Sequence, residues 1–226
     1  MNTLHTFGCS YTAFYERSDR KEFDQYKEYN GGKFPKTWPE LLSEKLGLNL
    51  NNVAIGGSSN YEIFHSFCDN VDNFKKGDVV IIGWSYKERF RLVNNKINDF
   101  VRVGPGFIPE KLIDGISSKS IEEILVNRME QKWVDELISW EKLIKKICDL
   151  IGMKLLIWSF DKTIPNHDNF LMVLREQHGA TRIFDETNGK IVDYHFATKG
   201  HIVQANYFLD VINEKIKYNY KEKKLI

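Results

Sequence analysis

Residues 79–84 read Val-Val-Ile-Ile-Gly-Trp, and this stretch decides the fold class. The run is continuous, apolar and rich in β-branched residues, and the turn residues Gly77 and Asp78 precede it. A strand of this composition is typically buried on both faces of a parallel sheet. Residues 154–159, Lys-Leu-Leu-Ile-Trp-Ser, form a second run of the same kind. The two runs therefore predict two core strands of a parallel sheet.

Strand and helix patterns alternate along the rest of the chain. Shorter β-prone runs cover residues 3–8, 48–54 and 181–184. Apolar residues at helical spacing predict helices over residues 37–47, 60–74, 120–151 and 168–178, with a last helix from residue 201. The alternation predicts a single α/β domain over residues 1–226, built as a three-layer, doubly wound (flavodoxin-like) sheet of about five parallel strands with helices on both faces.

Three polar segments interrupt this alternation. Residues 15–36 are crowded with charged side chains and close on Gly31-Gly32, which predicts a long loop. Residues 86–118 have poor periodicity and contain Gly104-Pro105-Gly106, which predicts a second insertion that could act as a lid. The Lys- and Tyr-rich residues 215–226 predict a frayed tail.

Composition excludes several classes of protein. The 226 residues include 32 Lys and Arg against 31 Asp and Glu, a net charge of +1, which does not favour a nucleic-acid partner. Apolar residues make up 42% and charged residues 28%, as in soluble globular domains, which excludes a disordered or fibrous protein. The sequence has neither a long apolar span nor a signal-peptide pattern, so we expect a cytoplasmic protein without a membrane partner.

The cysteines give no sign of a disulfide framework or a metal site. Cys9, Cys68 and Cys148 are odd in number, far apart and without a C-x-x-C pair or grouped histidines. We expect free thiols and no zinc. His5 lies in a predicted strand and is expected to be a packed core histidine, and we assign no role to the others outside the site, His65, His167 and His178.

The candidates for chemistry lie just after the strands, because ligands gather at the carboxyl ends of such a sheet. Ser10 follows the first strand and the Gly56-Gly57 turn follows the second, while Asp193 and His195 lie near the C-terminus. A serine at a strand-to-helix turn needs a base, and His195 can fill that role with Asp193 as its hydrogen-bond acceptor. The glycine turn can offer an N–H to an oxyanion. This combination indicates acyl transfer.

These pieces, in this order, resemble blocks of the SGNH hydrolases, also called the GDSL esterase/lipase family. Residues 7–12, Phe-Gly-Cys-Ser-Tyr-Thr, resemble the first block, which implies Ser10 as nucleophile and its backbone N–H as an oxyanion donor. Asn52-x-Ala54-x-x-Gly57 resembles the second block, which implies the N–H of Gly57 as the next donor. Asp193-x-His195 resembles the fifth block, which implies His195 as base and Asp193 as the residue that orients it.

The third block departs from the family pattern. Where the family has Gly-x-Asn-Asp and uses the Asn as a third oxyanion donor, this chain has Gly83-Trp84-Ser85-Tyr86. The hydroxyl of Ser85 could replace the missing amide, or Asn60 could reach in from the second block's helix, and the sequence leaves both open. The Gly-Trp-Ser form is similar to a divergent branch seen in phage and bacterial carbohydrate-related loci.

The resemblance implies a serine esterase that needs no metal and no organic cofactor. The polar, aromatic-rich segments 11–36 and 86–118 suit a small acyl ester, such as an O-acetyl group, on a saccharide, and we expect Tyr11, Trp84 and Arg89 to contact the substrate. If the chain is phage-encoded, it could be virion-associated or act in the host cytoplasm.

Other interpretations stay open at this point. An O-acyltransferase would use the same acyl-serine, and a catalytically inactive binding module, such as a phage structural or host-interaction protein, would keep the fold and the pocket. A nucleotide or flavin binder would need a phosphate-cradling loop that the sequence lacks. Taken singly, Ser10 could be a helix N-cap, Gly56-Gly57 a plain turn, and Trp84 an aromatic core residue at a strand end.

Overall fold

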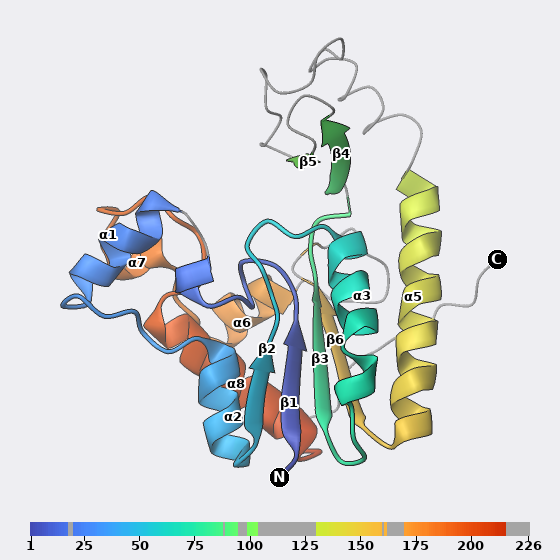
Figure 1. The fold of residues 1–226 in the computed structure, drawn as a ribbon. Helices are drawn as coiled ribbons and strands as arrows, with labels where there is room; N and C mark the ends of the chain where they lie inside the picture. The colour runs from blue at the N-terminus through green and yellow to red at the C-terminus, as the bar shows by residue number, and fades with distance from the viewer. Residues whose placement is uncertain are drawn as a thin grey trace.

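A four-stranded parallel sheet forms the centre of the computed structural model, which describes residues 1–17, 20–87, 89–94, 99–103, 130–159, 161 and 170–215. The strand order is β2 (Asn49–Asn52), β1 (Thr3–Phe7), β3 (Val79–Trp84) and β6 (Lys154–Ser159) (Figure 1). Every neighbouring pair is parallel. The predicted α/β class is confirmed, with four described strands in the parallel sheet against about five expected.

Helices cover both faces of the sheet (Figure 1). One face packs against α2 (Trp38–Leu46), α6 (Phe170–His178) and α8 (Thr198–Ile212), and the other against α3 (Asn60–Asp69) and α5 (Glu130–Ile151). The alternation of side chains in β3 divides the core between them: Val79 and Ile81 belong to the first cluster, and Val80, Ile82 and Trp84 to the second. The result is a three-layer arrangement.

Local signals fix the helices that the sequence predicts. A capping box of Thr37 and Glu40 opens α2, and Gly47 ends it with a left-handed φ of 64°. A second capping box, Ser59 with Glu62, opens α3, which ends at Asp69 and is followed by the 3-10 turn η2 (Val71–Asn73). The last helix begins at Thr198, earlier than expected, and the parts of the helices predicted over 120–129 and 168–169 lie outside the described residues.

Two predictions about local structure are wrong. The polar segment 15–36 is not only a loop, because it holds the 3-10 turn η1 (Tyr15–Arg17) and the helix α1 (Lys21–Tyr29). Its aromatic residues Phe23 and Tyr26 are buried in a third apolar cluster beside α7 (Ile183–Glu186). The strand predicted over 181–184 is a single bridge followed by α7, because its backbone pairs with residues 195–197 instead of with the sheet.

The second insertion carries structure of its own. Residues Phe90–Asn94 (β4) and Asp99–Val103 (β5) form an antiparallel pair separate from the main sheet. Residues 104–129, on which much of the predicted lid falls, lie outside the described residues, as does the predicted tail beyond residue 215. Within the described ranges, no helix has the length and apolar character needed to cross a membrane.

The predictions of a packed core histidine at His5 and of free cysteine thiols are confirmed. His5 is buried, pairs with Asp78 at 3.1 Å and packs its ring edge-on against Phe74. All three cysteines are free thiols. The described residues contain no group of three or more metal-ligating side chains.

Candidate active site

The turn after β1, residues 8–13, places Ser10 at the carboxyl edge of the sheet, and we call it the nucleophile turn. The Cys9 carbonyl accepts the N–H groups of both Thr12 and Ala13 at 2.9 Å, which winds the chain into a tight turn. The Asn52 side chain donates to the carbonyl of Thr12 at 2.9 Å and ties the turn to the end of β2. Gly8 is required, since a Cβ there would lie 2.4 Å from Thr12 Oγ1.

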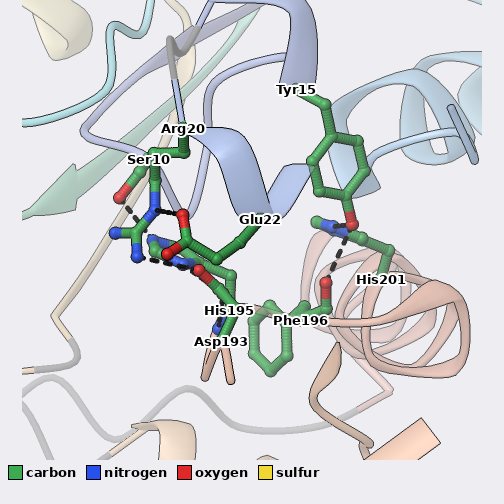
Figure 2. A network of polar contacts seen from close by, with 8 residues as sticks. All are labelled: Ser10, Tyr15, Arg20, Glu22, Asp193, His195, Phe196 and His201. Atoms are coloured by element: carbon green, nitrogen blue, oxygen red, sulfur yellow. Dashed lines mark hydrogen bonds and ion pairs between the residues drawn. The ribbon is translucent and has the colours of Figure 1, made fainter. Parts of the chain in front are cut away.

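Three side chains from opposite ends of the sequence form one line of hydrogen bonds at this edge (Figure 2). His195 Nε2 lies 2.7 Å from Ser10 Oγ, and His195 Nδ1 lies 2.7 Å from Asp193 Oδ1. A carboxylate can only accept, so Nδ1 carries the proton and Nε2 is left to accept from the serine hydroxyl. Ser10, His195 and Asp193 thus adopt the arrangement in which a serine is activated by a histidine.

Asp193 is held as a buried carboxylate. Burial acts to raise its pKa, but the side-chain hydrogen bond and charge of His195, the His195 backbone N–H at 2.8 Å and the charge of Arg20 together hold the pKa below its ordinary value. Arg20 Nη2 lies 2.9 Å from Oδ2 as an ion pair. That oxygen accepts no hydrogen bond from the described residues, so the guanidinium charge is what balances it. Glu22 lies beside Arg20 at 3.8 Å.

The segment 193–197, which we call the base loop, is fixed by side chains and backbone from outside the sheet. The His195 ring lies between the rings of Tyr11 and Phe23, with centroids 4.6 and 5.2 Å away. The carbonyls of His195 and Asp193 accept the N–H groups of Ile183 and Phe184 at 3.0 and 2.9 Å. The region that was predicted to be a fifth strand therefore supports the catalytic histidine candidate.

A buried relay of hydrogen bonds continues from the base loop into the core (Figure 2). The backbone N–H of Trp38 donates to His201 Nδ1 at 3.1 Å, so His201 Nε2 carries the proton and donates to the Tyr15 hydroxyl at 2.9 Å. Tyr15 then donates to the carbonyl of Phe196 at 2.8 Å. Burial, together with the smaller effect of the nearby His195 charge, lowers the pKa of His201 to about 3, so His201 is neutral at pH 7.

Candidate oxyanion donors lie around the nucleophile. The backbone N–H groups of Ser10 and Gly57 make no hydrogen bond within the described chain, and both residues are partly exposed. Gly57 has a φ of 78°, which favours glycine. Asn60 Oδ1 accepts the N–H of Ser85 at 2.7 Å, and its Nδ2 donates one hydrogen to the Ser85 carbonyl at 3.2 Å. The second Nδ2 hydrogen has no acceptor among the described residues, so Asn60 keeps a donor to offer.

The third-block residues are placed differently from what we expected. Trp84 is fully buried and donates from Nε1 to Glu141 at 2.7 Å, so the prediction that it contacts substrate is wrong. Ser85 is also fully buried, and its Oγ accepts from Arg89 at 2.8 Å, which leaves its hydroxyl no surface with which to reach an oxyanion. Tyr11 and Arg89 are partly exposed, as substrate contacts must be.

Sequence reasoning missed four residues that support the triad: Arg20, Phe23, Tyr15 and His201. The first three lie in segment 15–36, which was predicted to be a loop. The aromatic residues of this segment were the one sign in the sequence that it packs against the rest of the protein. His201 stands at the predicted start of the last helix, where the sequence indicates no role for it. Its burial and its bond to Tyr15 make it a structural histidine.

No protein-family model matches the chain, and no curated protein matches it. The solved structures that are similar to it include a carbohydrate esterase whose active site is described as displaying divergent catalytic and non-catalytic binding functions. The match has a TM-score of 0.46 and 9% sequence identity, and covers 94% of this chain and 68% of that chain. A likeness of this size does not establish a family for the chain.

Proposed function

We propose that this protein is a serine esterase of the SGNH type. The observation that carries the proposal is the unbroken line from Ser10 Oγ through the His195 ring to Asp193, with both heavy-atom distances at 2.7 Å. A helix cap or a solvated loop histidine would not require a buried carboxylate behind the imidazole, ion-paired in turn to Arg20.

The chain's residues support acyl transfer in two half-reactions. Ser10 Oγ attacks the ester carbonyl while His195 Nε2 takes its proton, and the carbonyl oxygen becomes an oxyanion facing the N–H groups of Ser10 and Gly57. Asp193 stabilises the imidazolium, which then gives its proton to the leaving alcohol. Water, deprotonated by His195, then attacks the acyl-serine; as the bond to Ser10 Oγ breaks, the His195 imidazolium returns the proton to Oγ and the acid is released. Asn60 is the better candidate for the third oxyanion donor, because it is 5% exposed and its Nδ2 keeps one hydrogen to donate, whereas Ser85 is fully buried.

We infer a small acyl group, such as acetyl, on a polar molecule such as a saccharide. The aromatic rings of Tyr11 and Phe23 enclose the base, which favours a compact acyl group over a long chain. The polar side chains of Arg20 and Glu22 lie beside the same pair of residues, Asp193 and His195.

Hydrolysis of p-nitrophenyl acetate, together with fluorophosphonate labelling located by mass spectrometry, tests the proposal. We expect wild type to turn over and to be labelled at Ser10, and we expect Ser10→Ala and His195→Ala to lose at least about 10³-fold in kcat. Lys145→Gln removes an exposed ion pair on α5 and serves as the matched control for effects of mutagenesis, purification and folding that are unrelated to the site. Unlabelled, inactive wild type would favour the binding-module alternative.

A further inference from the structure

Arg89 is a partly buried cation without an acidic partner. Its Nη1 donates to the neutral Ser85 Oγ at 2.8 Å, and its guanidinium lies 5.2 Å from the centre of the Tyr86 ring. Its own backbone N–H bonds to the Tyr86 carbonyl at 3.1 Å, which fixes the chain between them. No carboxylate in the described part of the chain pairs with it, so most of its N–H donors remain available.

Arg182 is a second cation of the same kind. It is partly buried, and its guanidinium lies 5.7 Å from the centre of the Tyr194 ring. Its backbone forms the bridge to Phe196, which holds it against the base loop. Among the described residues it too has no carboxylate partner. Holding a guanidinium on an aromatic ring leaves its edge free to bind an anion.

The two arginines are connected to the candidate site through different residues. Arg89 is bonded to Ser85, which Asn60 joins to the start of α3 on the side of the oxyanion donors. Arg182 lies on Tyr194, between Asp193 and His195. Tyr11 lies near the surroundings of both arginines. Its ring centroid is 4.6 Å from that of His195, and its hydroxyl is close enough to interact electrostatically with Tyr86 and Arg182.

Two acids described at this edge have partners other than these arginines. Asp193 is ion-paired with Arg20 and bonded to His195, and Asp161 accepts the backbone N–H of Lys87 at 3.2 Å. Neither acid forms an ion pair with Arg89 or Arg182 among the described residues, so each guanidinium keeps N–H donors for an anionic ligand. We propose that the natural ester carries a carboxylate, as an acidic sugar does, and that Arg89 and Arg182 bind it. This inference rests on the proposed esterase function, whose substrate class it narrows.

A matched pair of esters tests the inference. Methyl O-acetylglucopyranoside and the corresponding O-acetylated methyl glucuronide differ only in a carboxylate for a hydroxymethyl group, and acetate release gives kcat/KM for each. We expect the kcat/KM of wild type to be about tenfold or more higher for the acidic ester. Tenfold corresponds to the lower end of what one charge-assisted hydrogen bond contributes. In Arg89→Gln and Arg182→Gln the ratio falls towards one, mainly through KM. The ratio cancels any general loss of activity, and Lys145→Gln controls for the loss of one positive charge.

Binding provides a second arm that does not depend on turnover. Calorimetric titration of the Ser10→Ala protein with methyl glucuronide and with methyl glucoside measures the preference directly. We expect the carboxylate preference to disappear when either arginine is also replaced. Equal binding and equal kcat/KM for the two sugars in wild type would overturn the inference while leaving the esterase intact. A carboxylate preference in binding without labelling of Ser10 would instead overturn the esterase proposal and keep the anion site.

Discussion

The nucleophile turn and the base loop supply the two partners of the 2.7 Å contact between Ser10 Oγ and His195 Nε2, but different interactions hold the two segments in place. The nucleophile turn is held by its own backbone and by Asn52 at the end of the adjacent strand. The base loop has no strand of the sheet beneath it and depends on side chains from α1 and the 3-10 turn before it, on α7, and on the buried His201. The sheet positions the serine, whereas a small satellite cluster positions the histidine.

This difference implies that the nucleophile turn is more stable against local unfolding than the base loop. Residues fixed by a parallel sheet share the stability of the core, whereas a loop held by a few long-range contacts can open without unfolding the sheet. Substitutions on the two sides should therefore differ in kind as well as in size. The following predictions probe that contrast, beginning with the largest effect.

The largest effect is expected for Asp193→Asn in the base loop. An amide at this position cannot stabilise the imidazolium, and it can leave His195 in the wrong tautomer, so kcat should fall about 10⁴-fold. Esterase kinetics measure the loss, and thermal unfolding checks that the protein still folds. A loss smaller than tenfold would mean that Asp193 acts only as an ion-pair partner for Arg20.

On the nucleophile side we expect the next largest effect, from Asn60→Asp. The aspartate can still accept the N–H of Ser85, but it has no hydrogen to donate and places a negative charge near the oxyanion. Loss of one such donor should lower kcat about 10²- to 10³-fold with a smaller change in KM. Ser85→Ala is the matched comparison, and its kcat should fall by less than tenfold. The reverse order would assign the third donor to Ser85.

A smaller effect is expected when the support of the base loop is weakened at Arg20. Its side chain is 43% exposed, so solvent screening reduces what the ion pair with Asp193 contributes. Arg20→Gln should lower kcat about three- to tenfold, and Arg20→Lys should restore part of it. High salt should bring wild type towards the variant. An unchanged kcat across salt concentrations would show that hydrogen bonds alone hold Asp193.

The same contrast explains how much the sequence could predict. The strands of residues 79–84 and 154–159 and the positions of Ser10 and Gly57 just after strands are encoded by neighbouring residues, so pattern and spacing were enough. Trp84 shows the limit of that method. An aromatic residue at a strand end can face a site or the core, and only the partner Glu141, from a distant helix, decides for the core.

Helix α1 could not be predicted for a related reason. Its two buried residues, Phe23 and Tyr26, stand among charged neighbours and give too weak a pattern to call for a helix. They gain burial only when α7 and the base loop are already in place. The Tyr26 hydroxyl donates to Glu186 at 2.5 Å and accepts the Thr198 N–H at 3.0 Å, contacts made across more than 150 residues of sequence.

The smallest effect concerns the stability of the base loop at low pH. His201 has a pKa of about 3 in the folded protein against 6.5 ordinarily. The unfolded chain therefore takes up a proton that the folded protein does not, and stability present above pH 6.5 is lost as the pH falls towards 3. At pH 5 the loss is about 2 kcal/mol. Urea unfolding at pH 7 and pH 5 measures it, and His201→Gln should remove most of this difference.

Hydrogen exchange measures which part of the structure loses stability first at low pH. His201 bonds to Tyr15 and through it to the base loop, so acid should first speed exchange at the amides of Ile183, Phe184 and Ala197, which pair with or lie in that loop. Amides of β3 should keep their protection, because that strand is hydrogen-bonded to a neighbour on each side. His5, whose pKa burial also lowers, is unchanged in the His201→Gln variant and serves as the internal reference. Uniform acceleration over both regions would mean that the base loop and the sheet open as one cooperative unit.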